Sequence, residues 1–430
     1  MNVLRGLVAG ILTWEARFVL ARFKPRIIAV TGSVGKTTTK DAIFAALSEH
    51  VYVRKSEKSY NSEIGVPLTI LGFENAWRNP FLWLWNLVKG LALIIMPDKY
   101  PQWLVLEVGA DRPGDIRRIA HWLKPDIVVM TGVPNIPVHV EYFRSPEELV
   151  REKQVLAEYL KPGGKLIVNG DDVRMREFRS TFRGACITFG IEENNDCRGE
   201  KEEIVYERGE PIGVQFRVNY KNSSFPISIF GALGRPRVYA ALAALVVGEA
   251  IGVDMVSMAR SLTQWAPPPG RLRLVRGLRG SIIIDDTYNS SPAAAMAALD
   301  TLKNVDAKRR IAVLGDMLEL GKYAAEAHKQ VGERAVACAD VLFTVGFRAR
   351  TIGEAALDAG ISESDIREYE HSEAERAGKE LELELKEGDV VLVKGSQAMR
   401  MERTVLEIMA EPARAEELLV RQDPAWLAKP

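Results

Sequence analysis

The stretch IAVTGSVGKTTTKDAIFAAL, residues 28–47, places an apolar run directly before a glycine-rich turn and a helix-forming sequence. Residues 26–31 predict a buried strand, and residues 37–48 predict the helix that follows it. A glycine-rich turn between strand and helix points successive backbone N–H groups, together with the positive end of the helix, at an oxyanion. The stretch therefore predicts a phosphate-binding loop (P-loop).

Within this loop, Lys36 is placed to reach the β- and γ-phosphates of a nucleotide, and Thr37 to present its hydroxyl to Mg²⁺. The common pattern has a glycine five residues before Gly35, where this chain has Val30, so the match is to the shorter variant T-G-S-x-G-K-T-T. A turn that only joins strand to helix is the alternative, and the Lys-Thr-Thr sequence disfavours it. The predicted nucleotide-binding residues of the loop are Gly32, Ser33, Val34, Gly35, Lys36, Thr37 and Thr38.

The rest of the chain predicts two α/β units. Short β-branched segments at 102–110, 126–133 and 163–172 alternate with helical stretches such as 145–160, which predicts a parallel sheet covered on both faces. Residues 195–232 alternate in polarity and predict a small antiparallel insertion. Three prolines and a glycine at 267–270 mark a boundary, after which a second strand–helix series begins. We therefore expect a central P-loop ATPase domain at 26–266 and a Rossmann-like C-terminal α/β domain at 267–430.

Two apolar segments stand out from this pattern. Residues 1–25 predict an N-terminal amphipathic helix with Leu7, Val8, Phe18 and Val19 near one face, and residues 77–100 form an apolar insertion in the central domain. Each falls short of the roughly 20 clean apolar residues that a bilayer span needs. Two interpretations stay open: helices packed on the protein, or amphipathic helices in peripheral contact with a membrane surface.

Composition narrows the class of protein. Lys+Arg and Asp+Glu both number 57, so the formal net charge is zero, and a nucleic-acid partner is not expected because such proteins usually carry a basic excess. The three cysteines, Cys186, Cys197 and Cys338, are scattered and form no CxxC pair. A disulfide framework or zinc site is therefore not expected, and a reducing cytoplasm fits best.

Two further residues predict a metal site beside the P-loop. Glu107 ends a predicted strand, where open α/β sheets place their ligands, and His139 follows the next strand. A carboxylate and an imidazole near bound phosphates can complete the shell of a bridging Mg²⁺. A strand-end glutamate that is only solvated is the alternative.

Six ordered motifs carry a resemblance to a known family. The chain resembles the Mur ligases, ATP-dependent amide-forming enzymes of cell-wall precursor synthesis, and within them the branch that adds D-alanyl-D-alanine to a muramyl peptide. The motifs are TGSVGKTTTKD (31–41), NSEIGVPLTIL (61–71), LEVGADRPGDI (106–116), DDTYNSSP (285–292), IAVLGDMLELG (311–321) and VLVKGSQAMRME (391–402).

The resemblance implies roles for particular residues. Glu107 and His139 match magnesium ligands, and Lys153 matches a lysine that is carbamylated and becomes an acid-like ligand. With Thr37 these form the implied metal set, for two Mg²⁺ ions, and Lys36, Glu107, His139 and Lys153 are the implied catalytic residues. Nucleotide contacts are implied for Asn169 in the central domain and, in the C-terminal domain, for Arg271, Asp286, Tyr288 and Asn289.

The chain departs from the family in two places. The usual enzyme has a UDP-binding domain before its P-loop, and we expect that domain to be absent because only about thirty residues precede Gly32. The family also reads Gly-x-His-Asn and then Asn three residues on, where this chain has Pro236, Arg237 and Ala240. Arg237 is therefore either a base-stacking residue or a surface arginine at a helix start.

The sequence predicts a cytoplasmic ATP-dependent, ADP-forming ligase that acts through an acyl phosphate, and the apolar segments leave open a placement at the inner membrane face. Its expected substrates are a muramyl-peptide carboxylate and an amino acid or dipeptide amine. The alternatives are a Mur-type ligase for another acceptor, or an inactive membrane-peripheral scaffold that binds nucleotide.

Overall fold

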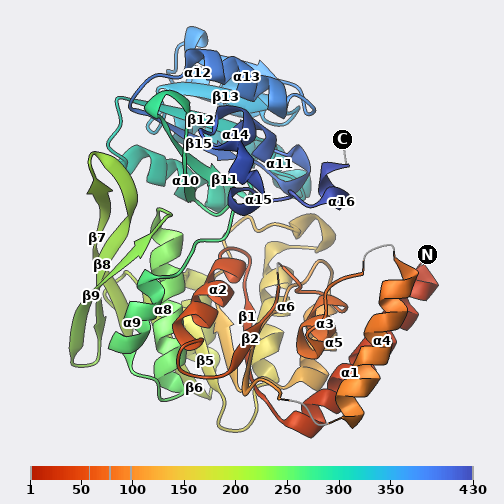
Figure 1. Cartoon of the computed structure of the whole chain (residues 1–430). Helices are drawn as coiled ribbons and strands as arrows, with labels where there is room; N and C mark the ends of the chain where they lie inside the picture. The colour runs from red at the N-terminus through yellow and green to blue at the C-terminus, as the bar shows by residue number, and fades with distance from the viewer. Residues whose placement is uncertain (1, 58, 77–78, 97–98, 429–430) are drawn as a thin grey trace.

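The computed structural model describes residues 2–57, 59–76, 79–96 and 99–428. Residues 77–78 and 97–98 of the predicted apolar insertion lie outside this range. Figure 1 shows two layered α/β units, one built from the first half of the chain and carrying both apolar helices at its edge, and one built from the second half. The boundary expected at 267–270 lies between the last helix of the first unit and the first strand of the second, and stays a prediction.

The first unit is built on a nine-stranded sheet in the order β2-β3-β1-β4-β5-β6-β7-β8-β9. Strands β2 to β7 run parallel, as predicted, and β7 to β9 pair antiparallel. The antiparallel strands β7 to β9 are the insertion predicted at 195–232, and they extend the same sheet because β7 pairs with Phe189 and Gly190 of β6. The strands are β1 (Arg26–Thr31), β2 (Val53–Lys55), β3 (Trp103–Glu107), β4 (Ile127–Met130), β5 (Lys165–Asn169), β6 (Ala185–Gly190), β7 (Cys197–Glu207), β8 (Glu210–Tyr220) and β9 (Ser223–Phe230).

Helices cover both faces of this sheet. Alternate residues of β1 enter different cores: Ile28 and Val30 pack with one set of helices, and Ile27 and Ala29 with the other. This is the reason for the unbroken apolar run of β1, since a strand buried on both faces needs no polar side. The helices on the first face are α2 (Lys36–Leu47), α8 (Arg235–Ala250) and α9 (Met255–Thr263); those on the second are α3 (Gly65–Leu71), α5 (Asp115–Leu123), α6 (Pro146–Glu158) and α7 (Val173–Thr181).

The two apolar segments form adjacent helices, α1 (Asn2–Phe23) and α4 (Pro80–Ile95), at the edge of the first unit (Figure 1). The apolar face predicted for α1 is only partly buried. Val19 is buried, but Leu7 and Phe18 are exposed, because α1 packs on the protein through Leu12, Ala16 and Val19. No helix in the described ranges is both long and apolar enough to cross a membrane.

The second unit is a six-stranded sheet in the order β10-β11-β15-β12-β13-β14. All its neighbours are parallel except the antiparallel edge strand β10. The strands are β10 (Arg273–Arg276), β11 (Ile282–Asp286), β12 (Arg309–Gly315), β13 (Val341–Val345), β14 (Ile366–Tyr369) and β15 (Asp389–Lys394). The helices are α10 (Pro292–Asn304), α11 (Ala324–Ala335), α12 (Arg350–Asp358), α13 (Ala374–Glu384), α14 (Glu402–Ile408), α15 (Ala415–Leu418) and α16 (Pro424–Leu427).

Candidate active site

The P-loop connects β1 to α2 through two glycines with positive φ. Gly32 has φ 142°, and a Cβ there would lie 2.1 Å from Thr131 Oγ1, so only glycine fits against β4's end. Gly35 has φ 81° and directly precedes α2. The Thr131 hydroxyl donates to Val34 O at 2.6 Å and fixes the middle of the loop.

The loop leaves backbone donors open for an anion. Ser33 N donates to Gly132 O, but no described residue accepts a hydrogen bond from the N–H groups of residues 34–37. These donors lie at the start of a twelve-residue helix, whose dipole adds positive potential. Lys36 opens the same helix, and burial lowers the pKa of its ammonium, an effect that the Glu107 carboxylate opposes. The arrangement fits the phosphates of a nucleotide.

Glu107 lies beside the loop because β3 pairs with β1, which brings it level with Val30. Its side chain is only 1% exposed, and its two oxygens accept from the Thr37 hydroxyl at 2.9 Å and from Asn61 Nδ2 at 3.1 Å. A carboxylate and a hydroxyl in contact at the first turn of α2 are hard oxygen donors of the kind that Mg²⁺ prefers. Thr37 and Glu107, predicted separately, are therefore brought together.

His139 lies further along the same end of the sheet, in a left-handed conformation with φ 67°. Its Nε2 lies 3.9 Å from Asp111 Oδ1, and its Nδ1 lies 2.7 Å from Glu319 Oε2. Glu319 belongs to the second unit, so this contact joins the two halves of the chain. The described residues contain no group of three or more His, Cys, Asp or Glu side chains arranged to hold a metal.

Lys153 lies on α6 and is 2% exposed. Burial lowers the pKa of its ammonium to about 7, and the nearby charge of Lys36 adds to this effect. The Glu152 carboxylate raises the pKa of Lys153 and so opposes this effect only in part. The same carboxylate accepts hydrogen bonds from the backbone N–H groups of Gly114 and Ile116. A buried lysine with so low a pKa has a neutral amine available for reaction with CO₂.

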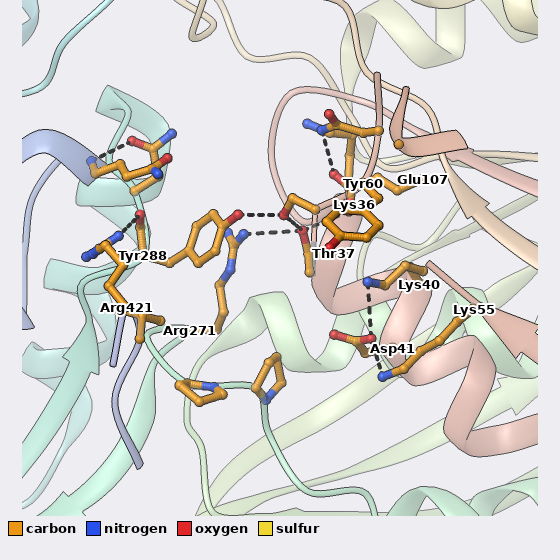
Figure 2. Close-up of a pocket in the computed structure, with 18 of the residues that line it drawn as sticks. Lys36, Thr37, Lys40, Asp41, Lys55, Tyr60, Glu107, Arg271, Tyr288 and Arg421 are labelled. Atoms are coloured by element: carbon orange, nitrogen blue, oxygen red, sulfur yellow. Dashed lines mark hydrogen bonds and ion pairs between the residues drawn. The ribbon is translucent and has the colours of Figure 1, made fainter. Parts of the chain in front are cut away.

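The second unit reaches the P-loop through Arg271 and Tyr288, as Figure 2 shows. Arg271 Nη2 donates to Thr37 Oγ1 at 3.2 Å, and the Tyr288 hydroxyl donates to Ser59 Oγ at 2.6 Å. Ser59 Oγ in turn lies 3.2 Å from Thr37 Oγ1. The Arg271 guanidinium also stacks on the Tyr288 ring at 3.8 Å. Two of the predicted nucleotide residues of the second half, Arg271 and Tyr288, therefore lie beside the P-loop.

Other predicted residues lie behind this surface. Asp286 ends β11 and is ion-paired with Lys394 at 2.5 Å, an interaction that ties the ends of β11 and β15 together. Asn169 donates to Thr131 O and supports the loop from below. Among the described residues that line the cleft are Asn289 and His139, but not Gly32, Thr38, Lys153, Asn169 or Asp286.

Neither interpretation of Arg237 is correct. Its side chain is 1% exposed, so it is not a surface arginine, and it does not line the cleft, so it is not placed to stack on a bound base. It lies 4.8 Å over the Trp265 ring and donates to Arg271 O at 2.7 Å. The reason is packing, since α8 is buried along most of its length and carries Arg237 inward.

The cleft between the units has a volume of about 2150 Å³. This exceeds the space that one drug-sized ligand needs, so more than one substrate can be held. The chain's C-terminal segment forms part of its wall. There Arg421, itself paired with the buried Glu402, donates to Tyr288 O. Sequence reasoning missed Ser59 and Arg421, which lie outside the six motifs. Asn61, which donates to Glu107, lies inside the motif at residues 61–71.

Comparison with known proteins agrees with this architecture. Residues 30–81 and 87–248 match the Mur ligase middle domain, and residues 270–397 match the family described as Mur ligase, glutamate ligase domain. A Synechocystis UDP-N-acetylmuramoyl-tripeptide–D-alanyl-D-alanine ligase is 30% identical over 402 residues, covering 93% of this chain and 76% of that protein. The chain belongs to the Mur ligase family.

Two further relatives are similar over most of the chain. The ligase of the same name from Bacillus subtilis is 29% identical over 401 residues, covering 92% of this chain and 79% of its own. The crystal structure of the Thermotoga maritima MurF ligase in complex with ADP superposes with a TM-score of 0.75 and 27% identity, covering 93% of this chain and 83% of that one. The α/β fold expected for a Mur ligase is therefore confirmed.

Proposed function

We propose that this Mur ligase is an ATP-dependent, ADP-forming enzyme that joins D-alanyl-D-alanine to the carboxylate of a muramyl tripeptide. One observation carries the proposal: a P-loop with open N–H donors and a buried Glu107 is met from the other unit by Arg271 and Tyr288. The names of the Bacillus and Synechocystis relatives support the choice of substrates. A cytoplasmic location goes with it, because ATP is supplied there.

The residues of the loop would hold the triphosphate of ATP. The N–H groups of residues 34–37 donate to phosphate oxygens, and Lys36 adds a positive charge beside the transferring group. Arg271 and Tyr288 complete the enclosure from the second unit. Asn289 lines the same cleft and is available to the nucleotide, whereas Asp286 and Asn169 act by holding strand ends and the loop in place.

Magnesium fits the oxygen-rich side of this site. Thr37, Glu107 and His139 would hold it, together with Lys153 once its neutral amine has combined with CO₂ to form a carbamate. Two ions are expected, as in the resemblance, and when bound they neutralise charge on the phosphates. An unmodified ammonium at Lys153 would repel them, so the low pKa of this buried lysine supports the modification.

The reaction follows from two displacements. The substrate carboxylate oxygen attacks the γ-phosphorus of ATP, ADP leaves, and an acyl phosphate results. The amine of the dipeptide then attacks the acyl carbon, and the tetrahedral intermediate loses inorganic phosphate and a proton to give the amide. Lys36 and the helix dipole stabilise the transferring phosphoryl group. Contacts such as Tyr288 to Ser59 keep the units closed and exclude water, which would otherwise hydrolyse the acyl phosphate.

The test is ADP release by the purified chain, measured with D-alanyl-D-alanine and either nucleotide-linked or lipid-linked muramyl tripeptide. We expect release only when both substrates are present, and loss of release in Lys36→Ala but not in Lys161→Ala. The partly buried Lys161 pairs with Asp126, and neither residue lines the cleft. Release with another amine instead would identify a ligase for a different substrate. No release with any amine would favour a nucleotide-binding scaffold.

A further inference from the structure

Helix α4 presents an apolar face to solvent. Of its exposed residues, Phe81 is 82% exposed, Leu84 62%, Trp85 55% and Ile95 74%, and the spacing of three and four residues puts them on one side of the helix. Val88 and Leu91 belong to the same stripe. We call these six residues the outer face of α4.

The opposite face of α4 is also apolar and is already used. Trp83, Leu87 and Ile94 pack toward the second core of the first unit, and Gly90 is buried against α1. Apart from Asn86 and Lys89, the residues of α4 are apolar on both faces, a pattern typical of helices that are fully buried or in contact with lipid. In the structure its outer face has neither environment, since α4 lies outside α1 at the edge of the protein (Figure 1).

Helix α1, which packs against α4, also exposes aromatic side chains. Trp14 and Phe18 are 49% and 47% exposed, and their rings are 4.5 Å apart. Scattered exposed apolar residues are normal on soluble proteins, but large apolar side chains gathered in the open on two adjacent helices mark an interaction site. Both helices contribute tryptophan to it, a residue enriched where protein meets the boundary between lipid and water.

The exposed charges on the two helices are of one sign. Residues 2–24 and 80–96 contain a single acidic residue, Glu15, and its side chain is only 1% exposed. The exposed charges are cations, namely Arg17, Arg22 and Lys24 on or just after α1, and Lys89 over the Trp85 ring of α4. In a chain whose formal net charge is zero, this local excess is complementary to an anionic surface.

The dimensions favour lying on a bilayer over crossing it. The sixteen residues of α4 extend about 24 Å at 1.5 Å per residue, less than the roughly 30 Å hydrocarbon core. We propose that α1 and the outer face of α4 bind the surface of an anionic phospholipid bilayer, with the apolar side chains in the interface and the cations beside lipid headgroups.

This placement has a consequence for the cleft. Val8 of α1, Pro80 and Trp83 of α4 line one end of it. A chain bound through these helices therefore holds that end of the cleft near the lipid surface. The inference adds a location to the ligase activity and does not depend on it.

Vesicle flotation of the full chain tests the proposal. The probe is a vesicle of phosphatidylcholine with about a third phosphatidylglycerol, compared with pure phosphatidylcholine. The outer-face variant Leu84→Gln/Val88→Gln/Ile95→Gln should lower the partition coefficient at least tenfold, because three exposed apolar side chains no longer enter the interface. Lys89→Gln should lower it about fivefold on anionic vesicles only.

The matched control changes three equally exposed apolar residues elsewhere. Val173, Phe347 and Leu383 are 57%, 74% and 74% exposed, and their replacement by Gln should leave vesicle binding unchanged. An unaltered thermal midpoint in each variant shows that the fold is retained. Absence of vesicle binding, or equal binding by the outer-face variant, overturns the proposal. So does a discrete dimer that the outer-face variant abolishes, since the patch would then be covered by a second copy.

Discussion

The carboxyl group of Glu15 makes the packing of α1 on α4 depend on pH. A Cβ added at Gly90 would lie 2.1 Å from Glu15 Oε2, so the carboxyl group occupies the space that the glycine leaves between the helices. Glu15 Oε2 is buried and has no hydrogen-bond partner among the described residues. An unpaired carboxylate in such a place is costly, and protonation relieves the cost.

Burial raises the pKa of Glu15 from 4.5 to about 7. The folded protein therefore keeps this proton between about pH 4.5 and 7 while the unfolded chain loses it, and stability falls as pH rises through that interval. At about 1.4 kcal/mol per pH unit the full cost above pH 7 would be about 3 kcal/mol, and screening at a surface helix pair reduces it to about 2 kcal/mol.

Glu15→Gln removes the charge and keeps the shape of the protonated acid. We expect the free energy of unfolding to increase by about 2 kcal/mol at pH 8.5 and to stay unchanged at pH 4, where the carboxyl is protonated in both states. Urea denaturation followed by tryptophan fluorescence measures this, because Trp14, Trp83 and Trp85 lie in the two helices.

Glu333→Gln is the control, since this glutamate is about half exposed and should show no such dependence on pH. Equal stabilisation by Glu15→Gln at pH 4 and pH 8.5 would refute the reasoning, because the gain would then come from packing or helix propensity and not from a buried charge.

Two predictions concern the cleft. Tyr288→Phe removes the hydroxyl that donates to Ser59, and the loss of one such bond, about 1 kcal/mol, should lower kcat/KM about fivefold in the ADP-release assay. In a double-mutant cycle, adding Ser59→Ala to Tyr288→Phe should lower kcat/KM little further, and full additivity of the two losses would contradict a direct role for the bond. Lys153→Ala should abolish turnover, and acetate or another short carboxylic acid should restore part of it by replacing the carbamate. Undiminished turnover in Lys153→Ala would rule out that role.

Most strands could be predicted from the sequence because their burial leaves a simple pattern. Strands such as β1 and β15 are covered on both faces and so appear as unbroken apolar runs. The antiparallel edge strand β10 and the polar strand β14, IREY, were missed because short edge strands are only partly buried. The antiparallel insertion at 195–232 could be predicted as well, because alternating polarity marks strands that are buried on one face only.

The site was predictable where residues lie at strand ends. Lys36 and Glu107 follow adjacent strands, and the parallel sheet brings them together without further information. Ser59 and Arg421 lie on loops that no periodicity describes, and their contacts with the Tyr288 segment depend on how the two units pack. The pairing of His139 with Glu319 also depends on how the two units pack, because each residue comes from a different unit. Both residues adopt positive φ where the units meet.

Arg237 stands at a position where this chain differs from the family motif. It does not line the cleft and instead holds the backbone of Arg271, which lies beside the P-loop. The Arg237 guanidinium is held over Trp265 and donates to the carbonyl oxygen of Arg271. The side chain of that same Arg271 donates to the P-loop Thr37. Two hydrogen bonds thus connect a buried helix residue of the first unit to the hydroxyl beside the phosphate site. A buried guanidinium is costly unless paired, and the bond to Arg271 O together with the contact on Trp265 offsets part of that cost.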